Sequence, residues 1–474
     1  MNQHAHWNAC DCARPLTRRE MLGRSAAGFA SLALTGLLAE EASAMRADPL
    51  AVRPPHHPAK AKRVIFLFMH GGPSQIDTFD YKPLLDRDHG KPLPFAKPRV
   101  VSAETGNLLR SPWKFRQHGQ SGAWVSELFP HVAGIADQLC FIHSMHGSNS
   151  RHGGALLELH TGSDTFVRPS MGSWINYGLG TENRDLPGVI TICPTLPHGA
   201  ENNYSSAFLP AVYQGTPMGN ASIKSKDAKI PFIENQTPIE SQRRELDLLA
   251  EMNRRHLPSD ETADALEARI DSFELAFRMQ AAAPQLQDIS DESPATLELY
   301  GLNDPQTADF GLQCLMARRF AEAGVRFVQA SHSYKWDQHS ALKRDHAKNA
   351  MEVDQPIAAL ILDLKARGLL DDTLVLWGGE FGRTPTAQGG DGRDHNPHGY
   401  TMWLAGGGVK PGVHYGQTDD YGYFSVADKV HVHDLHATML HLLGLDHLRL
   451  TFRYAGRDFR LTDVHGEIVH DILA

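Results

Sequence analysis

Histidine, carboxylate and arginine side chains gather beside the apolar runs of this chain, where most of these runs end and the last one begins. Imidazoles and carboxylates are the usual protein ligands of divalent metal ions, and guanidinium groups bind phosphate and sulfate oxygens. We therefore predict one combined metal and anion site. Its metal ligands are expected among His70, Asp77, His152, Asp337, His339, Glu380, His395 and His398, and its catalytic or anion-binding residues are expected to be His152, Arg383 and Arg393.

Each of these residues, taken alone, has an ordinary structural explanation. A single histidine after a strand more often makes a hydrogen bond than binds a metal. Glu380 could pair with Arg383, and Arg393 could pair with its neighbour Asp394. The metal site is favoured because independent structural histidines have no reason to cluster at one edge of a sheet.

Short, continuous apolar runs predict the elements that hold these residues. Such runs, ended by glycines or polar residues, are typical of strands buried on both faces of a parallel sheet. They span residues 64–69, 139–142, 189–193, 325–329, 374–377 and 401–404, and helical patterns at 155–162, 310–324 and 349–365 lie between them. We predict an α/β fold with a mostly parallel central sheet and helices on both faces. In such sheets ligands bind at the carboxyl ends of the strands.

Residues 200–310 interrupt this alternation. A polar loop region comes first, and a long charged helical segment follows at 238–280. We interpret the whole stretch as a helical insertion that serves as a cap or an oligomer contact. The chain closes with an amphipathic helix within 434–447 and a hairpin within 453–463.

The first 44 residues predict an export signal. Arg18 and Arg19 precede a modest apolar run, and a small-residue cleavage site ends at Ala44. This is the layout of a twin-arginine signal, and it predicts a periplasmic or otherwise extracytoplasmic protein. The run is short and rich in small residues, so a stable membrane span in the mature chain is not expected, and a retained anchor is the alternative. Residues 45–62 are interpreted as a linker and 63–474 as the folded domain.

Charge and cysteine content exclude some classes of protein. The formal net charge is −9, and no basic block is present to hold a phosphate backbone, so nucleic acid is not an expected partner. Cys140, Cys193 and Cys314 remain after removal of the signal and lie in apolar surroundings. Their number and spacing predict neither a disulfide framework nor a metal cluster.

Several motifs give the chain a resemblance to a known family. The runs VIFLFMHGGPSQIDTFD, WDQH, GGEFGRTP, GRDH and YAGRDFRLTD resemble the bacterial family of unknown function DUF1501. That family is similar to the alkaline phosphatase and sulfatase superfamily. The resemblance covers the mature chain apart from residues 200–310, and it implies an alkaline-phosphatase-like fold.

The resemblance also implies which residues occupy the superfamily's site positions. The nucleophile position, ten residues before the glycine of a closing Thr-Gly, falls on His152. A metal-binding aspartate falls on His70, and an Asp-His pair falls on Glu380 and Phe381. The Asp-x-x-x-His motif is matched by Asp337 and His339 with altered spacing. The last metal-binding histidine is matched by His395, with His398 as the rival.

This pattern replaces carboxylates by imidazoles and lacks a hydroxyl or thiol nucleophile. Imidazoles favour zinc, iron or manganese over calcium, and one or two ions are expected. Water activated by the metal would then be the nucleophile, while His152 would be a ligand, an acid or itself a nucleophile. The expected function is an exported hydrolase of phosphate or sulfate esters, acting on an anionic ester such as a sulfated or phosphorylated glycan.

Two other functions stay open. The protein could be a non-catalytic envelope protein that binds anionic glycans through its metal site, or a metal-dependent lyase or isomerase. The hydrolase interpretation makes a geometric prediction. It requires the side chains at the strand ends to converge, with His152 beside them, and these are His70, Asp337, His339, Glu380 and His395.

Overall fold

The computed structural model describes residues 48–96, 98, 104–234, 237–255 and 262–474. The predicted twin-arginine signal therefore lies outside the described residues. Residues 49–474 form one compact unit.

A nine-stranded sheet runs through this unit in the order β12-β4-β11-β8-β1-β7-β5-β6, with β15 also paired to β4. Its strands are β1 (Arg63–Phe68), β4 (Cys140–His146), β5 (Val189–Ile192), β6 (Thr216–Met218), β7 (Phe327–Ser331), β8 (Thr373–Gly378), β11 (Tyr400–Ala405), β12 (His414–Tyr415) and β15 (Val430–His431). The six apolar runs of the sequence are all strands of this sheet. The α/β class and the mostly parallel sheet are thus confirmed.

One strand of the sheet, β11, runs against its neighbours β4 and β8, while β1 pairs in parallel with β7 and β8. Because β11 is reversed, its amino end lies beside the carboxyl ends of β4 and β8. Residues that precede β11 therefore reach the same edge of the sheet as residues that follow the parallel strands. Every residue of β1 and β8 is buried, which explains their continuous apolar sequences.

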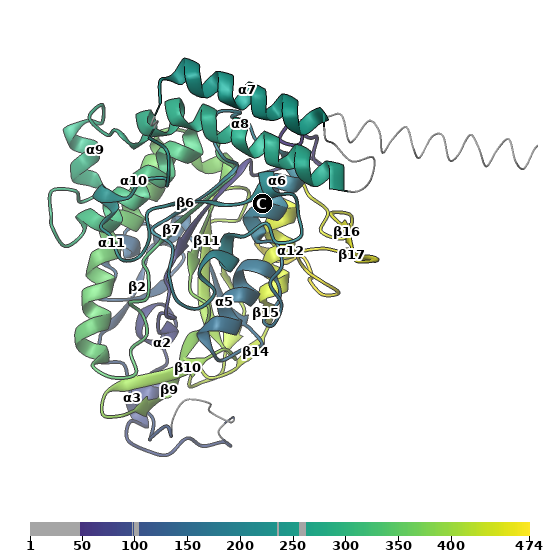
Figure 1. The fold of residues 1–474 in the computed structure, drawn as a ribbon. Coiled ribbons are helices and arrows are strands. Elements are labelled where there is room, and N and C mark those ends of the chain that lie inside the picture. The colour runs from purple at the N-terminus through teal and green to yellow at the C-terminus, as the bar shows by residue number, and fades with distance from the viewer. Residues whose placement is uncertain (1–47, 97, 99–103, 235–236, 256–261) are drawn as a thin grey trace, which may run out of the picture. The chain divides into compact units, whose positions relative to one another are not determined.

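Helices cover both faces of the sheet (Figure 1). On one face lie α10 (Ala308–Glu322) and α11 (Leu342–Ala366), and on the other lie α5 (His152–Thr161), α6 (Met171–Leu179) and α12 (Val432–Leu442). Short helices are α2 (Gln75–Thr78), α3 (Pro83–Arg87), α4 (Pro130–Ala133) and α9 (Pro294–Leu299). The helical patterns of the sequence are confirmed, with starts and ends shifted by a few residues.

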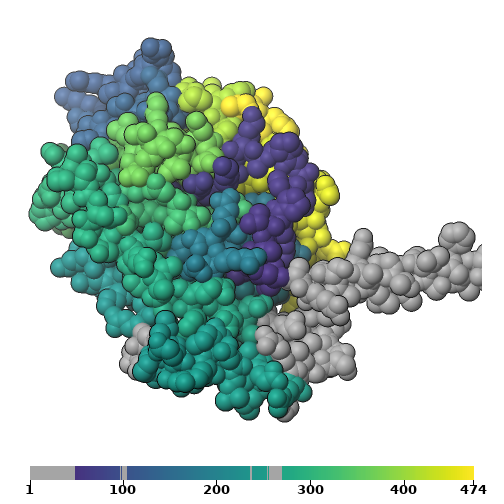
Figure 2. Space-filling model, turned by 90° about the horizontal axis from the view of Figure 1, so that it is seen from above, coloured from purple at the N-terminus to yellow at the C-terminus, as the bar shows by residue number. Residues whose placement is uncertain are grey.

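The expected insertion at 200–310 is partly built into the sheet. β6 adds a parallel edge strand beside β5, and its Pro217 is tolerated there because an edge strand has an unpaired side. Beyond it, α7 (Ile239–Arg255) and α8 (Thr262–Gln287) form the predicted helical segment, which lies on the face seen in Figure 2. Among the described residues, no helix is long and apolar enough to cross a membrane.

The expected linker packs against the domain from residue 49 onward. The backbone N–H of Arg53 donates to the carbonyl of Leu179 at 2.9 Å, and that of Lys60 donates to Leu442 at 2.8 Å. Leu50 is buried. The end of this stretch is therefore part of the folded unit, and its proline-rich composition reflects an extended path over the surface.

Small hairpins complete the fold. Two of them are β2 (Phe115–His118) with β3 (Ala123–Ser126), and β13 (Gln417–Thr418) with β14 (Ser425–Ala427). The C-terminal pair, β16 (Phe452–Tyr454) and β17 (Arg457–Phe459), is the hairpin predicted from the sequence. The pair β9 (Gly382–Gln388) and β10 (Gly392–Asn396) was not predicted, and it projects from the sheet edge that carries the candidate site.

Candidate metal and anion site

Loops at the carboxyl ends of the parallel strands bring the candidate side chains together. His70 follows β1, Asp337 follows β7 and Glu380 follows β8. His152 is the first residue of α5, which follows β4, and His395 lies in β10, just before the reversed strand β11. Because all these positions lie at one edge of the sheet, residues separated by up to 325 positions meet in space.

The Asp337 carboxylate is the centre of the group. His339 Nε2 lies 2.9 Å and His395 Nε2 lies 3.1 Å from the same oxygen, Oδ1. The other oxygen, Oδ2, is 3.3 Å from His152 Nε2, although that pair lacks hydrogen-bond alignment. Arg383 Nη2 also donates to Oδ1, at 2.8 Å. Three imidazoles and one guanidinium therefore surround a single carboxylate.

The opposite ring nitrogens of His339 and His395 are already engaged. His395 Nδ1 lies 2.7 Å from the backbone carbonyl of Ser150, and His339 Nδ1 is in contact with the side-chain oxygen of Gln388. Since a carbonyl oxygen only accepts, each Nδ1 carries the proton. In the neutral rings the Nε2 lone pairs then both point at Asp337. Metal-binding histidines show this arrangement, in which the far ring N–H donates to an oxygen that fixes the tautomer.

His152 links the two carboxylates of the site. Its Nδ1 donates to Glu380 Oε1 at 2.6 Å, and the backbone N–H of Gly71 donates to the same oxygen at 3.1 Å. Burial lowers the pKa of His152, but Asp337 and Glu380 raise it by more, to about 9. Burial likewise opposes ionisation of Glu380, while His152 and His70 hold its pKa down at about 2. The ring is thus a proton-holding group between two ionised carboxylates.

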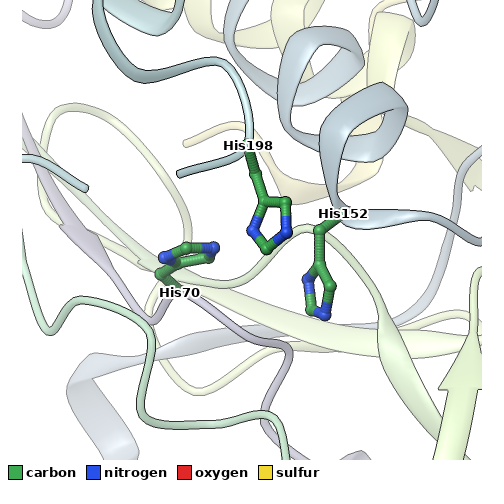
Figure 3. Close-up of side chains that lie close together, drawn as sticks. All are labelled: His70, His152 and His198. Carbon is green, nitrogen blue, oxygen red and sulfur yellow. The ribbon is translucent and has the colours of Figure 1, made fainter. Parts of the chain in front are cut away.

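A third part of the site consists of imidazoles alone. The rings of His70, His152 and His198 lie close together in Figure 3, with ring centroids 5.9 Å apart for His70–His152, 5.6 Å for His70–His198 and 4.8 Å for His152–His198. His198 lies on the loop after β5 and was not among the predicted residues. Two prolines, Pro194 and Pro197, lie between that strand and the histidine, so His198 does not directly follow the apolar run.

Among the residues that the structure describes, distances alone allow three groups of ligands around an ion. They are His70, His152 and His198; His152, Asp337 and His395; and His339, Asp394 and His395, and within each group the ligand atoms lie within 4.8 Å of one another. The convergence expected for His70, Asp337, His339, Glu380 and His395, with His152 beside them, is thus what the structure shows. The two rings with fixed tautomers, His339 and His395, occur in the second and third groups and both face Asp337, so these three residues fit a metal ion best.

Asp77 does not lie with these ligands. Its carboxylate pairs with Arg393, with Nε 2.6 Å from Oδ2 and Nη2 3.2 Å from Oδ1, and both side chains are 0% exposed. The remaining donors of Arg393 bond the carbonyls of Thr384 and Leu109. The structure thus corrects two expectations. Asp77 neutralises a buried arginine, and Arg393 has no nitrogen left over to hold an anion.

Arg383 is also turned into the protein. All three of its nitrogens donate to acceptors of the chain, namely the carbonyls of Gly71, Gly72, Trp336 and Arg393 and the carboxylate of Asp337. The guanidinium is 1% exposed. The expected anion-binding role is therefore replaced by another one, because Arg383 fixes Asp337 in place beneath the histidines.

His398 lies outside the group as well. It is exposed, and its ring packs against Phe424 at a centroid distance of 5.5 Å. Of the two rivals for the last histidine position, the structure places His395 in the site. Phe381 fills the space beside it, with its ring stacked on His395 at 4.4 Å and 5.0 Å from His152. An apolar ring therefore stands where the resemblance implied a second ligand, and it shields the imidazoles from water.

Comparisons with known proteins agree with the sequence motifs. The family model described as "Protein of unknown function (DUF1501)" matches residues 61–473. No curated protein matches the chain.

Solved structures with a similar fold share little sequence with this chain. The PsFucS1 sulfatase from Pseudoalteromonas sp. is 12% identical with a TM-score of 0.35, and the match covers 81% of this chain and 68% of that one. TAB5 alkaline phosphatase is 9% identical with a TM-score of 0.34, and the match covers 82% of this chain and 99% of that one. A phosphonate monoester hydrolase from Silicibacter pomeroyi is 15% identical with a TM-score of 0.28, over 67% and 68%. At these scores, function has to be argued from the side chains of this chain.

Proposed function

We propose that this chain, which belongs to the DUF1501 family, is an exported, metal-dependent hydrolase of phosphate or sulfate esters. The chemistry of the donor set supports the metal, and the resemblance of the sequence motifs to the alkaline phosphatase and sulfatase superfamily implies an anionic ester as substrate. The twin arginines at positions 18 and 19 support export.

One observation carries the proposal. The Nε2 atoms of His339 and His395 both face Asp337 Oδ1, while their Nδ1 protons are committed to Gln388 and Ser150. Two neutral rings would point lone pairs at a carboxylate oxygen, which is repulsive. Two imidazoliums beside Arg383 would crowd three positive charges around one carboxylate. A divalent cation held by Asp337, His339 and His395 removes both conflicts, and it is the ligand set expected for such an ion.

The nature of the ligands favours a transition metal. Calcium and magnesium prefer oxygen ligands, whereas two or three imidazoles with one carboxylate suit zinc, iron or manganese. Asp394 lies beside this set, with its Oδ1 3.9 Å from His339 Nδ1. The proposal places one ion at Asp337. When bound, such an ion supplies Lewis-acid activation of water and of an ester oxygen.

The residues of the chain then have separate roles. Arg383 and the backbone of Gly71 hold Asp337 and Glu380 in position. Glu380 orients His152, whose ring can pass a proton to the leaving oxygen of an ester, because it is a protonated base within the ligand group. Phe381 keeps water away from one side of the imidazoles. Since no hydroxyl or thiol occupies the His152 position, water is the nucleophile that the proposal requires.

Elemental analysis and ester hydrolysis test this proposal together. The protein is purified without a metal-affinity column, and zinc, iron, manganese and calcium are measured per chain. We expect close to one transition-metal ion, and hydrolysis of aryl phosphate or aryl sulfate. His339→Ala and His395→Ala should lose the ion and at least about 100-fold in activity, beyond what groups that merely orient a ligand contribute.

His398→Ala is the matched control, because this histidine comes from the same segment but lies outside the site. It should retain metal and activity. Stoichiometric calcium without a transition metal would contradict the ligand assignment.

A non-catalytic role is the second candidate, and the missing nucleophile together with Phe381 favours it. It predicts a bound metal, no hydrolysis of any ester under any metal, and binding of an anionic glycan that His152→Ala weakens. Export is tested separately. Replacing Arg18 and Arg19 by lysine should leave the protein in the cytoplasmic fraction if the twin-arginine route is used.

A further inference from the structure

The segment after β7 wraps around His70. The backbone N–H of Tyr334 donates to His70 Nδ1 at 3.1 Å, and the N–H groups of Lys335 and Trp336 donate to the His70 carbonyl, each at 3.2 Å. Tyr334 itself has a φ of +52°, a left-handed conformation that is costly for a bulky residue. This segment is tied to the loop that bears His198, because Ser333 Oγ donates to the Cys193 carbonyl at 2.9 Å.

The first of these hydrogen bonds fixes the position of the ring proton. Because Nδ1 accepts from a backbone N–H, it carries no proton, so the proton of His70 is on Nε2. A ring nitrogen that bears a proton has no lone pair for a metal ion. His70 therefore differs from His339 and His395, whose Nδ1 atoms donate and whose Nε2 lone pairs are free. The expectation that His70 is a metal ligand, which distances alone permit, conflicts with its hydrogen bonding.

The Nε2–H of His70 has no partner among the described residues. The side chain is 0% exposed, and Glu380 Oε1 lies 4.0 Å from Nε2, too far for a hydrogen bond. Unpaired buried donors are rare because they forfeit their hydrogen bonds to water. His198 Nδ1 is a second buried ring nitrogen without a partner among the described residues, and its ring lies 5.6 Å from that of His70. Two unpaired buried nitrogens on neighbouring rings are the pattern expected where a polar ligand binds.

The surroundings limit how an oxyanion could be held. Arg383 and Arg393 are buried, and every nitrogen of both guanidinium groups already donates to the protein, so neither is presented to an anion. An oxyanion in this site therefore depends on imidazole N–H groups and on the ion at Asp337. Beside the imidazoles stands Tyr334, which is 49% exposed and lies 5.1 Å from His70 and 5.3 Å from His198, so it forms the outer wall of the space.

We propose that His70 Nε2–H donates a hydrogen bond to an oxygen of a bound tetrahedral oxyanion, phosphate or sulfate, with His198 on the other side of it. His70 would thus be a substrate-binding residue and not a metal ligand. The identity of the anion in this inference rests on the proposed function. The conclusion that His70 does not bind the metal is independent of the proposed function.

The test measures metal content and oxyanion affinity separately. His70→Leu removes the ring, His70→Gln keeps a side-chain N–H donor, and His339→Ala serves as the variant that loses a metal ligand. Metal per chain is measured by elemental analysis, and binding of inorganic phosphate and of sulfate is measured by calorimetry. Circular dichroism and the melting temperature confirm that each variant is folded.

We expect His70→Leu to retain the wild-type metal content and to bind the oxyanion about 10- to 100-fold more weakly, as for loss of one hydrogen bond to a charged group. His70→Gln should bind the oxyanion within a few-fold of the wild type and carries the test if His70→Leu does not fold. Loss of metal from either folded His70 variant, to the extent seen for His339→Ala, would overturn the inference. Unchanged phosphate and sulfate affinity in both variants would overturn it equally.

Failure of the proposed function has a different signature. If the wild-type protein holds an ion and an oxyanion but hydrolyses no ester, the assignment of His70 stands and the hydrolase does not.

Discussion

The buried pair of Asp77 and Arg393 allows a test of whether these two residues stabilise the fold or take part in metal and anion binding. Asp77→Asn keeps the shape of the side chain and removes its charge. Arg393 then retains the carbonyls of Thr384 and Leu109 but loses the carboxylate that lies 2.6 Å from its Nε. The amide offers one oxygen where two carboxylate oxygens now accept, so a guanidinium charge stays buried without a counter-ion.

The magnitude follows from the burial. Both side chains are 0% exposed, and removing one partner of a fully buried ion pair costs about 3–5 kcal/mol. The carbonyls that remain bonded to Arg393 place the expected loss near the lower end of that range. We expect the free energy of unfolding in urea at pH 7 to fall by about 3 kcal/mol. Metal content and the oxyanion affinity of the folded fraction should stay as in the wild type.

The dependence on pH has a definite sign. Burial raises the pKa of Asp77 and Arg393 lowers it by more, so the net pKa lies below its usual value. The carboxylate therefore stabilises the fold above the unfolded pKa, near 3.9, and this contribution is lost as the pH falls toward the folded value. Asp77→Asn should accordingly differ most from the wild type at neutral pH and least in acid.

A matched double variant isolates the pair. Asp77→Asn with Arg393→Met removes both charges, so it should be less destabilised than the sum of the single changes, with a coupling of about 2 kcal/mol or more. The reasoning fails if Asp77→Asn is as stable as the wild type but loses its metal, since Asp77 would then be a ligand. It also fails if the two single losses simply add.

Three further predictions concern other parts of the molecule. Burial lowers the pKa of His436 to about 3 and the pKa of His332 and of His346 to about 4. These three rings therefore stay neutral in the folded protein at a pH near 6.5, where the histidines of the unfolded chain take up protons. Stability should therefore fall between pH 6.5 and 4, by up to about 1.4 kcal/mol per pH unit and histidine. Urea titrations at pH 7.5 and 5 measure this, and a flat profile, or the same slope in His436→Gln, would contradict it. Burial raises the pKa of Cys140 and Cys193 to about 12, so native protein should resist iodoacetamide until it is unfolded, and rapid labelling of either thiol would show that it is exposed. His152→Ser should lower the rate of ester hydrolysis although it installs a hydroxyl, because it removes the proton donor to Glu380. An active serine variant, or acid-labile phosphate trapped on the wild type, would contradict this prediction.

Six strands of the central sheet could be predicted because they are buried in the sheet and so form apolar runs, whereas the short, partly exposed strands β6, β12 and β15 could not. The direction of β11 could not be predicted in this way, since burial leaves the same pattern whichever way a strand runs. The hairpin of β9 and β10 was missed because its residues are polar yet buried. Arg383, Arg393 and Asn396 bond within the site edge instead of facing solvent, so the alternation of a surface hairpin is absent.

The location of the site could also be predicted, since residues that follow the strands of a parallel sheet all lie at the same edge of that sheet. The roles of individual residues could not be predicted. Asp77 and Arg393 are 316 positions apart, and nothing local shows that each is the other's partner. The composition of a motif likewise does not show where protons lie. His70 and His395 are both strand-end histidines, and they differ only in whether Nδ1 meets a backbone N–H or a backbone carbonyl.

That difference explains how a site with inward-facing arginines can still bind an anion. A guanidinium at the surface of a site provides a fixed positive charge whether or not a metal is present. Here Asp337 neutralises the charge of Arg383 and Asp77 neutralises that of Arg393, so the protein groups around Asp337 and Glu380 do not by themselves make the site electropositive. In the proposed function, the ion at Asp337, His339 and His395 adds its charge to that of the protonated His152 and attracts the oxyanion, and the neutral N–H of His70 orients the anion without adding charge. Oxyanion affinity is thereby coupled to metal binding, and a chain that leaves the cytoplasm already folded would carry its anion-binding capacity only if it also carried its metal.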